Sequence, residues 1–450
     1  MAESSTLERT SAVRKAVGKL RWLMVFLAFV GTTINYIDRA NLGVANTLIR
    51  KDLHIPPALM GLAIGSFFIS YAIFQLPNGY LVDRIGARIM YTFAVAWWSV
   101  FTAATAAARG FFSLSILRLL LGVGESGAYP SNAKIVAEWF PLRERGTATS
   151  IYDSGARFGT VASLPIVTWL ILNFGWRGSF LATGALGVVW AVAFVLLYRR
   201  PRQHPWVKRD ELAYIEQGSR SPDLERERVP VRWLDLFRYR TIWGMMIGFF
   251  CLNFVIYFFI TWFPDYLTTA RHFSLPKLGT VGTIPAIAAI PGGWLGGIVA
   301  DTLVRRGMDL TKARKICLVG GMACASVIAL VAFAPSAAVA IALLSVAYAS
   351  LTFAAASVWC LPADVAPSPN QVASIGGIQN FASNISGVIT SIFTGVVLQI
   401  TGNYVISLFA MGGFALLGAI SYLFIVGRIE PLEAKGGDPR LAAPTASGGA

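Results

Sequence analysis

The chain has 450 residues, of which 55% are hydrophobic and only 14% are charged, and its formal net charge is +15. Soluble proteins carry about 25% charged residues, so this composition excludes an ordinary soluble domain and indicates a membrane protein. The basic charge does not indicate nucleic-acid binding, because most of the 38 Lys and Arg residues lie in segments between apolar runs, on one side of the expected topology.

Apolar runs recur along the whole chain, and each is long enough to cross about 30 Å of hydrocarbon as a helix. They predict an all-α membrane protein with twelve transmembrane helices in two six-helix halves, at residues 22–46, 58–82, 89–108, 111–136, 147–173, 178–198, 241–266, 277–300, 316–334, 337–361, 371–398 and 403–426. Lys and Arg concentrate on the side of the two termini, which the positive-inside rule makes the cytoplasmic side.

These spans divide the chain into five parts. We expect a cytoplasmic tail at 1–21, the first half at 22–198, a cytoplasmic linker at 199–240, the second half at 241–426 and a cytoplasmic tail at 427–450. Within the linker, residues 210–217 fit a short amphipathic surface helix. Topology and anionic-lipid contact explain the basic residues of the linker, and binding of a partner is the alternative.

The first span carries two full charges, Asp38 and Arg39, inside an apolar run. Each charge costs about 2.5–3.5 kcal/mol at the centre of a spanning helix, so both are candidates for a site that faces a watery cavity or other charges. Three polar residues of the second span share one helix face and either line that cavity or bond neighbouring helices: Tyr71, Gln75 and Asn78.

A run from Gly79 to Arg88 joins the second and third spans, and a degenerate copy from Gly297 to Gly307 lies about half the chain later. The first copy resembles the G-x-L-x-D-R-x-G-x-R signature of the major facilitator superfamily. Repeats at this distance predict two pseudo-symmetric halves around a central path. We assign a stabilising or gating role to the charged residues of both copies: Asp83, Arg84, Arg88, Asp301 and Arg305.

The fourth and fifth spans add four more charges. Arg118 and Glu125 are seven residues apart, so they share a helix face about 10 Å apart along the axis. Asp153 and Arg157 are spaced to pair within one helix. The glycines around Glu125 and the following Pro130 would let the fourth span bend. The alternative to a functional site is a static ionic lock.

The second half is nearly free of charge inside its spans, and its polar residues are amides, hydroxyls and aromatics. The pattern fits a symporter in which one half handles protons and the other holds the hydroxyls of a substrate. The polar residues include Asn253, Tyr257, Thr261, Ser357, Trp359, Gln379, Asn380, Ser383 and Asn384.

Four stretches together resemble the anion:cation symporter family within that superfamily: Asn35–Ala45, Gly122–Pro130, Glu138–Pro141 and Tyr257–Pro264. The resemblance covers essentially the whole chain. It implies that Asp38 and Glu125 titrate with the coupled proton, that Arg39 binds the substrate carboxylate, and that Arg118 pairs with Asp38 or Glu125. The expected pocket contains Tyr36, Arg39, Tyr71, Arg157, Asn253, Tyr257, Ser357, Trp359, Gln379 and Asn380.

Arg157 departs from the family pattern, because many sugar-acid members have an amide or small polar group near this position. A second cation would meet a second carboxylate and favour a dicarboxylate or an aromatic acid. Alternatively, Asp153 neutralises Arg157 and the pair is structural. The residues leave both readings open.

The resemblance implies a proton-coupled importer of an organic carboxylate in a bacterial inner membrane. Sugar acids such as hexonates, hexuronates or aldarates are the first expectation, and an aromatic acid or a dicarboxylate is the alternative. An exporter or a membrane sensor fits less well. The chain lacks catalytic and ATP-binding motifs, so we do not expect an enzyme. We expect no metal, no cofactor beyond the co-transported proton and no obligate protein partner.

Overall fold

The structure is a computed structural model that describes residues 19–219, 233–367 and 371–432. Within them, eleven helices are long and apolar enough to span a membrane, and α7 is a merged pair that bends at Gly175, where φ is +70°. The prediction of twelve spans is therefore confirmed. The helices of the first half are α2 (Leu20–Asp52), α3 (Pro57–Ile85), α4 (Ala87–Ala104), α5 (Phe111–Glu125), α6 (Ala128–Trp139) and α7 (Leu142–Leu197).

The second half repeats this arrangement with more interruptions. Several of its helices begin with a proline in the first turn, where the missing N–H has no partner in any case. Its helices are α10 (Arg240–Thr261), α11 (Phe263–Thr269), α12 (Leu275–Thr280), α13 (Ile284–Arg305), α14 (Leu310–Ala325), α15 (Ala337–Val358), α16 (Leu361–Val365), α17 (Val372–Thr401) and α18 (Val405–Ile420).

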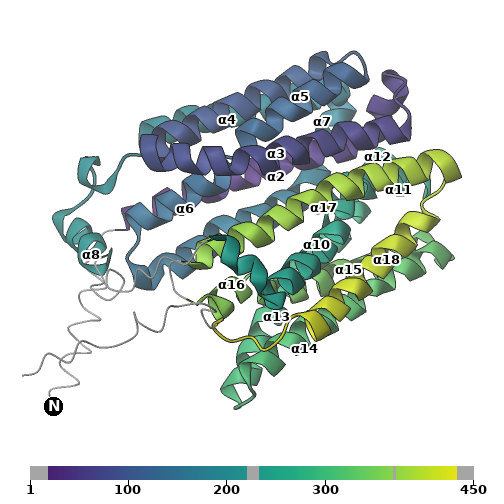
Figure 1. The fold of residues 1–450 in the computed structure, drawn as a ribbon. Helices are drawn as coiled ribbons and strands as arrows, with labels where there is room; N and C mark the ends of the chain where they lie inside the picture. The colour runs from purple at the N-terminus through teal and green to yellow at the C-terminus, as the bar shows by residue number, and fades with distance from the viewer. Residues whose placement is uncertain (1–18, 220–232, 368–370, 433–450) are drawn as a thin grey trace, which may run out of the picture.

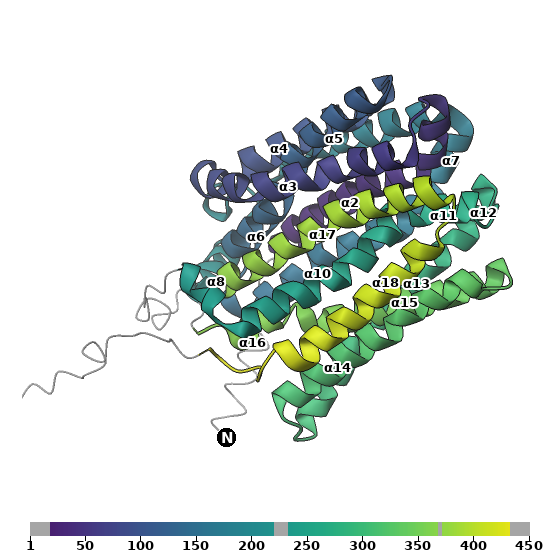
Figure 2. The ribbon, with the colours of Figure 1, turned by 45° about the vertical axis from the view of Figure 1, so that its right-hand side comes forward.

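The two halves lie side by side as two bundles (Figures 1 and 2). They meet chiefly where α3 packs along α17 and where α2 meets α10 and α11. We call the end of the bundles where α2 begins and α18 ends the terminal face, and the opposite end the far face. In Figure 1, α8 (Arg209–Ser219) and α16 mark the terminal face, and α11 and α12 mark the far face.

The linker contributes the expected surface helix, α8 (Arg209–Ser219), which docks on the first half. The buried carboxylate of Glu211 accepts hydrogen bonds from the backbone amides of Leu20 and Arg21, at 3.3 and 3.1 Å. These amides begin α2 and have no partner within that helix, so Glu211 caps it. Residues 220–232 of the linker, and most of both expected tails, fall outside the described residues.

The fourth predicted span consists of two helices. It breaks between Glu125 and Ala128, as the glycine-rich sequence predicts. Gly124 lies against α4, where a Cβ atom would collide with the Trp97 side chain. The break places Glu125 at the end of α5, in the middle of the bundle.

Candidate functional site

A buried ion pair joins α2 to α5. The Nε atom of Arg39 donates to Oε2 of Glu125 at 2.7 Å, and the Glu125 side chain is completely buried. Aromatic rings surround the guanidinium, with its carbon 5.1 Å from the centroid of Tyr36, 5.1 Å from that of Phe67 and 4.6 Å from that of Tyr71. Cation–π contacts of this kind stabilise a charge where water is excluded.

The pair leaves donors and acceptors unused. Within the described residues, Nη2 of Arg39 and Oε1 of Glu125 are buried without a hydrogen-bond partner, although the side chains of Tyr71 and Asn35 lie nearby. Unpartnered polar atoms in a buried site are costly unless a ligand, a proton or a second conformation satisfies them. The Arg39 guanidinium therefore has N–H donors available for a further anion.

Asp38 lies beside this pair and is fully buried. In the part of the chain that the structure describes, neither of its carboxylate oxygens accepts a hydrogen bond, although Thr183 and Trp98 lie nearby. Glu125 and Arg118 are both within electrostatic reach of Asp38. Burying a charged carboxylate without partners is expensive, so Asp38 is well suited to take up a proton.

The predicted pairing of Arg118 is not a direct ion pair among the described residues, although Asp38 and Glu125 both lie within electrostatic reach of its guanidinium. Arg118 is buried, its Nε atom has no hydrogen-bond partner, and its guanidinium lies 5.8 Å from the Phe67 ring. Arg118 makes no direct contact with Glu125 because Glu125 is already paired with Arg39, and because nearly two helical turns separate Arg118 from Glu125 on α5.

A cavity of about 130 Å³ opens between the two halves beside this cluster. Its polar lining comes from α2, α6 and α7 of the first half and from α10 and α15 of the second. These lining residues are Tyr36, Tyr129, Asp153, Arg157, Thr160, Asn253, Tyr257, Tyr348, Thr352 and Trp359. Asp153 and Arg157 are the charged members among the described residues that line it.

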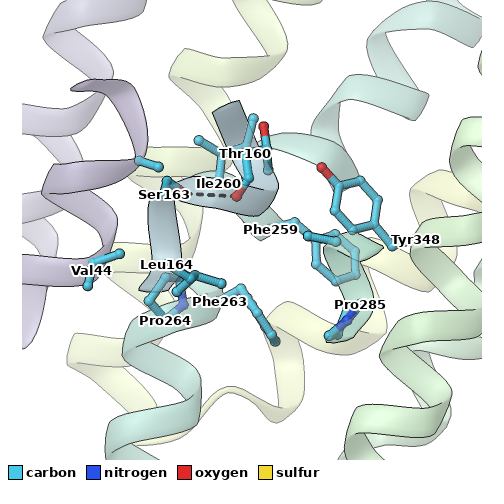
Figure 3. Close-up of a pocket in the computed structure, with 12 residues that line it drawn as sticks. Val44, Thr160, Ser163, Leu164, Phe259, Ile260, Phe263, Pro264, Pro285 and Tyr348 are labelled. Atoms are coloured by element: carbon cyan, nitrogen blue, oxygen red, sulfur yellow. Dashed lines mark hydrogen bonds between the residues drawn. The ribbon is translucent and has the colours of Figure 1, made fainter. Parts of the chain in front are cut away.

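A smaller cavity of about 20 Å³ continues toward the far face and shares Thr160, Ile260, Ala286 and Tyr348 with the first. Figure 3 shows its mainly apolar wall, in which Phe259 and Phe263 of the second half face Leu164 of α7. The path therefore narrows toward the far face.

The far face is closed by contacts between the halves. Asp265 of α11 is fully buried and pairs with Arg50 of α2, whose Nη1 atom is 3.2 Å from Oδ2. Asp265 also accepts hydrogen bonds from Thr47 and Tyr404. A further cross-half bond runs from the Ala58 amide to Gln399 Oε1 at 3.1 Å. The lining of the 130 Å³ cavity extends away from these contacts to the exposed Trp359 at the end of α15, so the cavity opens toward the terminal face.

The structure separates the predicted pocket residues into two groups. Tyr36, Arg157, Asn253, Tyr257 and Trp359 line the cavity. The other five do not line it. Arg39 and Tyr71 belong to the charged cluster behind Tyr36, and Ser357, Gln379 and Asn380 lie outside the cavity wall.

The positions of Ser357 and Gln379 have a simple cause. Both side chains are buried, and Gln379 Nε2 donates to the Val358 carbonyl at 3.3 Å, so Gln379 bonds α17 to α15. Sequence spacing does not fix which face of a helix meets a cavity. Tyr129 and Tyr348, which the sequence analysis did not single out, line the cavity instead. The one sequence feature that could have identified them is a phenol group within an apolar run.

The predicted gating residues lie near the terminal face. Lys134 of α6 pairs with Asp83 at 3.0 Å, the Arg84 guanidinium stacks on Tyr80, and Arg88 Nη2 donates to the Val195 carbonyl at 2.7 Å. The second copy is weaker. Arg305 donates to the backbone carbonyl of Asp301 at 3.3 Å, and the ion pair formed nearby is Arg314–Asp364 at 3.0 Å.

Comparisons with known proteins agree with this architecture. Residues 28–391 match the family model described as Major Facilitator Superfamily. A probable galactarate/D-glucarate transporter of Escherichia coli K12 is 37% identical, covering 96% of this chain and 99% of its own. A probable L-galactonate transporter of the same strain is 34% identical, with coverage of 94% and 92%. A crystal structure of a D-xylose–proton symporter shares the fold, with a TM-score of 0.71 and 16% identity over 92% of this chain and 100% of that one.

Proposed function

Because the chain belongs to the major facilitator superfamily, we propose that this transporter is a symporter that couples proton entry to uptake of a sugar acid across a bacterial inner membrane. The observation that carries the proposal is the buried Arg39–Glu125 pair, 2.7 Å long, directly behind the cavity-lining Tyr36. Relatives named as galactarate, D-glucarate and L-galactonate transporters support a sugar acid as the substrate.

The pair can act as an exchange site. When Glu125 takes up a proton, it loses its charge and its hold on Arg39, and the guanidinium can then pair with an incoming carboxylate. Hydrogen bonds between charged groups are strong where water is excluded. When Glu125 loses the proton again, it competes for Arg39 and expels the substrate. Asp38, buried without hydrogen-bond partners, is the second proton acceptor.

The positive-inside rule assigns the terminal face to the cytoplasm. On that assignment, the described conformation faces inward, because the far face is closed by Asp265 and the cavity opens the other way. Import then requires a second conformation in which the far-face contacts separate and the halves close at the terminal face.

The lining also suits an alternative substrate class. Tyr36, Tyr129, Tyr257, Tyr348 and Trp359 give the cavity an aromatic wall. Such rings pack against the apolar face of a sugar chain and equally against an aromatic acid. Phthalate, hydroxybenzoate and tartrate therefore belong in the same substrate screen as the sugar acids.

The test is uptake by the purified protein in liposomes, with labelled galactarate and galactonate and a pH gradient that is acidic outside. We expect accumulation that collapses when a protonophore removes the gradient. Glu125→Gln should bind and exchange substrate without accumulating it. Glu138→Gln, in an ion pair outside the buried cluster, is the matched control and should accumulate normally. Uphill uptake by Glu125→Gln at the normal rate would exclude the coupling role.

A further inference from the structure

We propose that Arg157 binds the second carboxylate of a dicarboxylic substrate, so that the Arg157–Asp153 pair on α7 sets a preference for sugar diacids over sugar monoacids. The inference rests on the proposed function and assigns a specificity-determining residue to the same cavity. It also chooses between the two roles that the sequence leaves open for Arg157.

Arg157 is the accessible cation of the cavity. Its side chain is 37% exposed, whereas Arg39 is 8% exposed and is bound to Glu125. Among the described residues that line the cavity, Arg157 carries the positive charge and Asp153 the negative one. A carboxylate that enters from the terminal face therefore reaches Arg157 without first displacing the buried pair.

Asp153 leaves most of the Arg157 guanidinium free. Its Oδ2 atom contacts only Nη2, at 3.5 Å, and the Tyr129 hydroxyl donates to its Oδ1 at 3.4 Å. A guanidinium has five N–H donors, and Nη2 contributes one N–H to each of the two edges, Nε/Nη2 and Nη1/Nη2, that can hold a carboxylate with two parallel bonds. The single contact with Asp153 uses one N–H of Nη2, so one of these edges stays free. Asp153 is therefore a positioning residue that orients the Arg157 side chain, and the hydrogen bond from Tyr129 orients Asp153.

Tyr36 connects the buried pair with the cavity wall that holds Arg157. Its ring centroid is 5.1 Å from the guanidinium carbon of Arg39, and the same side chain lines the cavity with Arg157. Tyr36 also packs on Gly159, two residues beyond Arg157, so closely that a Cβ atom on that glycine would collide with it. A substrate lying across Tyr36 would thus have a cation at each end.

The charge balance agrees with a dianion. If Asp38 and Glu125 are both protonated in the loaded state, the cluster retains two positive charges, on Arg39 and Arg118, and the Arg157–Asp153 pair adds none. A dianionic substrate brings the net charge of the whole site to zero, whereas a monoanion leaves a net positive charge in it. Unpaired buried charges are strongly unfavourable, so the loaded state favours the diacid.

The experiment measures dissociation constants by calorimetry for galactarate and D-glucarate, and for D-galactonate and L-galactonate, with the full-length protein in detergent. In Arg157→Gln, we expect diacid affinity to fall at least about tenfold, since hydrogen bonds to charged groups are among the stronger ones, and monoacid affinity to change less than about threefold. Arg157→Lys keeps the positive charge but cannot form two parallel hydrogen bonds, so its diacid affinity should lie between those of the unmodified protein and Arg157→Gln.

Arg177→Gln is the matched control. Arg177 is also on α7, is 46% exposed and pairs with a carboxylate, Asp52, at 2.5 Å, but it lies at the far face. It should leave all four affinities unchanged. If Arg157→Gln is too unstable to purify, Arg157→Lys is compared with the unmodified protein instead. An unchanged ratio of diacid to monoacid dissociation constants in Arg157→Lys overturns the inference.

The outcomes separate the two proposals. Equal losses for diacids and monoacids in Arg157→Gln, or no loss, would overturn the role of Arg157 and leave sugar-acid transport standing. Binding of monoacids alone by the unmodified protein would do the same. If the unmodified protein binds none of the four acids, the proposed function itself fails.

Discussion

The Arg39–Glu125 pair provides a test at the scale of single residues. Replacing Arg39 with Met leaves the Glu125 carboxylate buried without a cation, and breaking one side of a buried pair costs about 3–5 kcal/mol. The double variant Arg39→Met/Glu125→Gln removes both charges, so it should be more stable than Arg39→Met. A double-mutant cycle of unfolding free energies in detergent measures this coupling.

The exposed pair Arg202–Glu216 is the control for that cycle. Its N–O distance is also 2.7 Å, but its side chains are 74% and 40% exposed. Solvent screens such pairs, so we expect a coupling of about 0–1 kcal/mol. Coupling in the buried pair no larger than in this one would show that the Arg39–Glu125 contact does not stabilise the described conformation.

Some site residues can be predicted from the sequence because only a few kinds of surroundings can accommodate a charge inside a membrane span. Charges such as Asp38, Arg39, Arg118 and Glu125, inside apolar spans, must lie near one another or near water, and the structure brings them together. Asp265 could not be recognised in this way. It lies at the very end of the predicted span 241–266, where a charge is ordinary, and its partner Arg50 is remote in sequence, so only the packing of the halves reveals the pair.

At the scale of helices, closure of the far face depends on close backbone contact between α3 and α17. A Cβ atom on Gly61 would collide with the Ser391 carbonyl, and one on Gly395 with the Pro57 carbonyl. Gly61→Leu should therefore hold these helices apart and favour the conformation that is open at the far face. We expect loss of transport, because the cycle needs both conformations.

Cysteine labelling detects this opening. In a variant lacking the four native cysteines, Thr160→Cys places a thiol on the cavity wall. A membrane-impermeant maleimide added outside cells should label it faster when Gly61 is replaced by Leu. Gly413→Leu is the control, because nothing lies within 4 Å of a Cβ atom at this exposed position on α18. Unchanged labelling with Gly61→Leu would show that α3 and α17 are not part of the closure.

The helices themselves could largely be predicted, because length and hydropathy suffice to identify a span. The turn at Gly175, the break after Glu125 and the surface helix α8 follow from glycine, proline and polar patterns. The rotation of each helix about its axis could not be predicted. That is why Ser357 and Gln379, placed in the pocket by type and span, instead lie buried between α15 and α17.

At the scale of the whole molecule, alternating access requires that closing one face opens the other. The described residues join the halves by hydrogen bonds and an ion pair at the far face, through Asp265 and Gln399. The charged residues near the terminal face bond within their own halves, as the gating residue Asp83 does with Lys134, and Arg314 with Asp364. The ion pair and most of the hydrogen bonds that join the halves in this conformation are therefore gathered around Asp265.

Asp265→Asn should shift the molecule toward the conformation open at the far face. The change removes the charge that holds Arg50 but keeps an acceptor for Thr47, so the loss falls mainly on the ion pair between the halves. Breaking a buried charge pair at an interface costs about 2–5 kcal/mol, and 1.4 kcal/mol is a tenfold change in a population ratio. We expect the open fraction to rise at least about tenfold.

Spin labels at Arg109 and Pro335 can report the shift. Both are exposed at the far face, one in each half, so opening should lengthen the distance between them in a pulsed electron-resonance measurement. Asp52→Asn is the control, because its ion pair with Arg177 lies at the same face but within the first half, and it should leave the distance distribution unchanged. An Asp265→Asn distribution identical to that of the parent would show that this ion pair does not hold the two halves together, and that the apolar contacts of α3 and α17 suffice to close the far face.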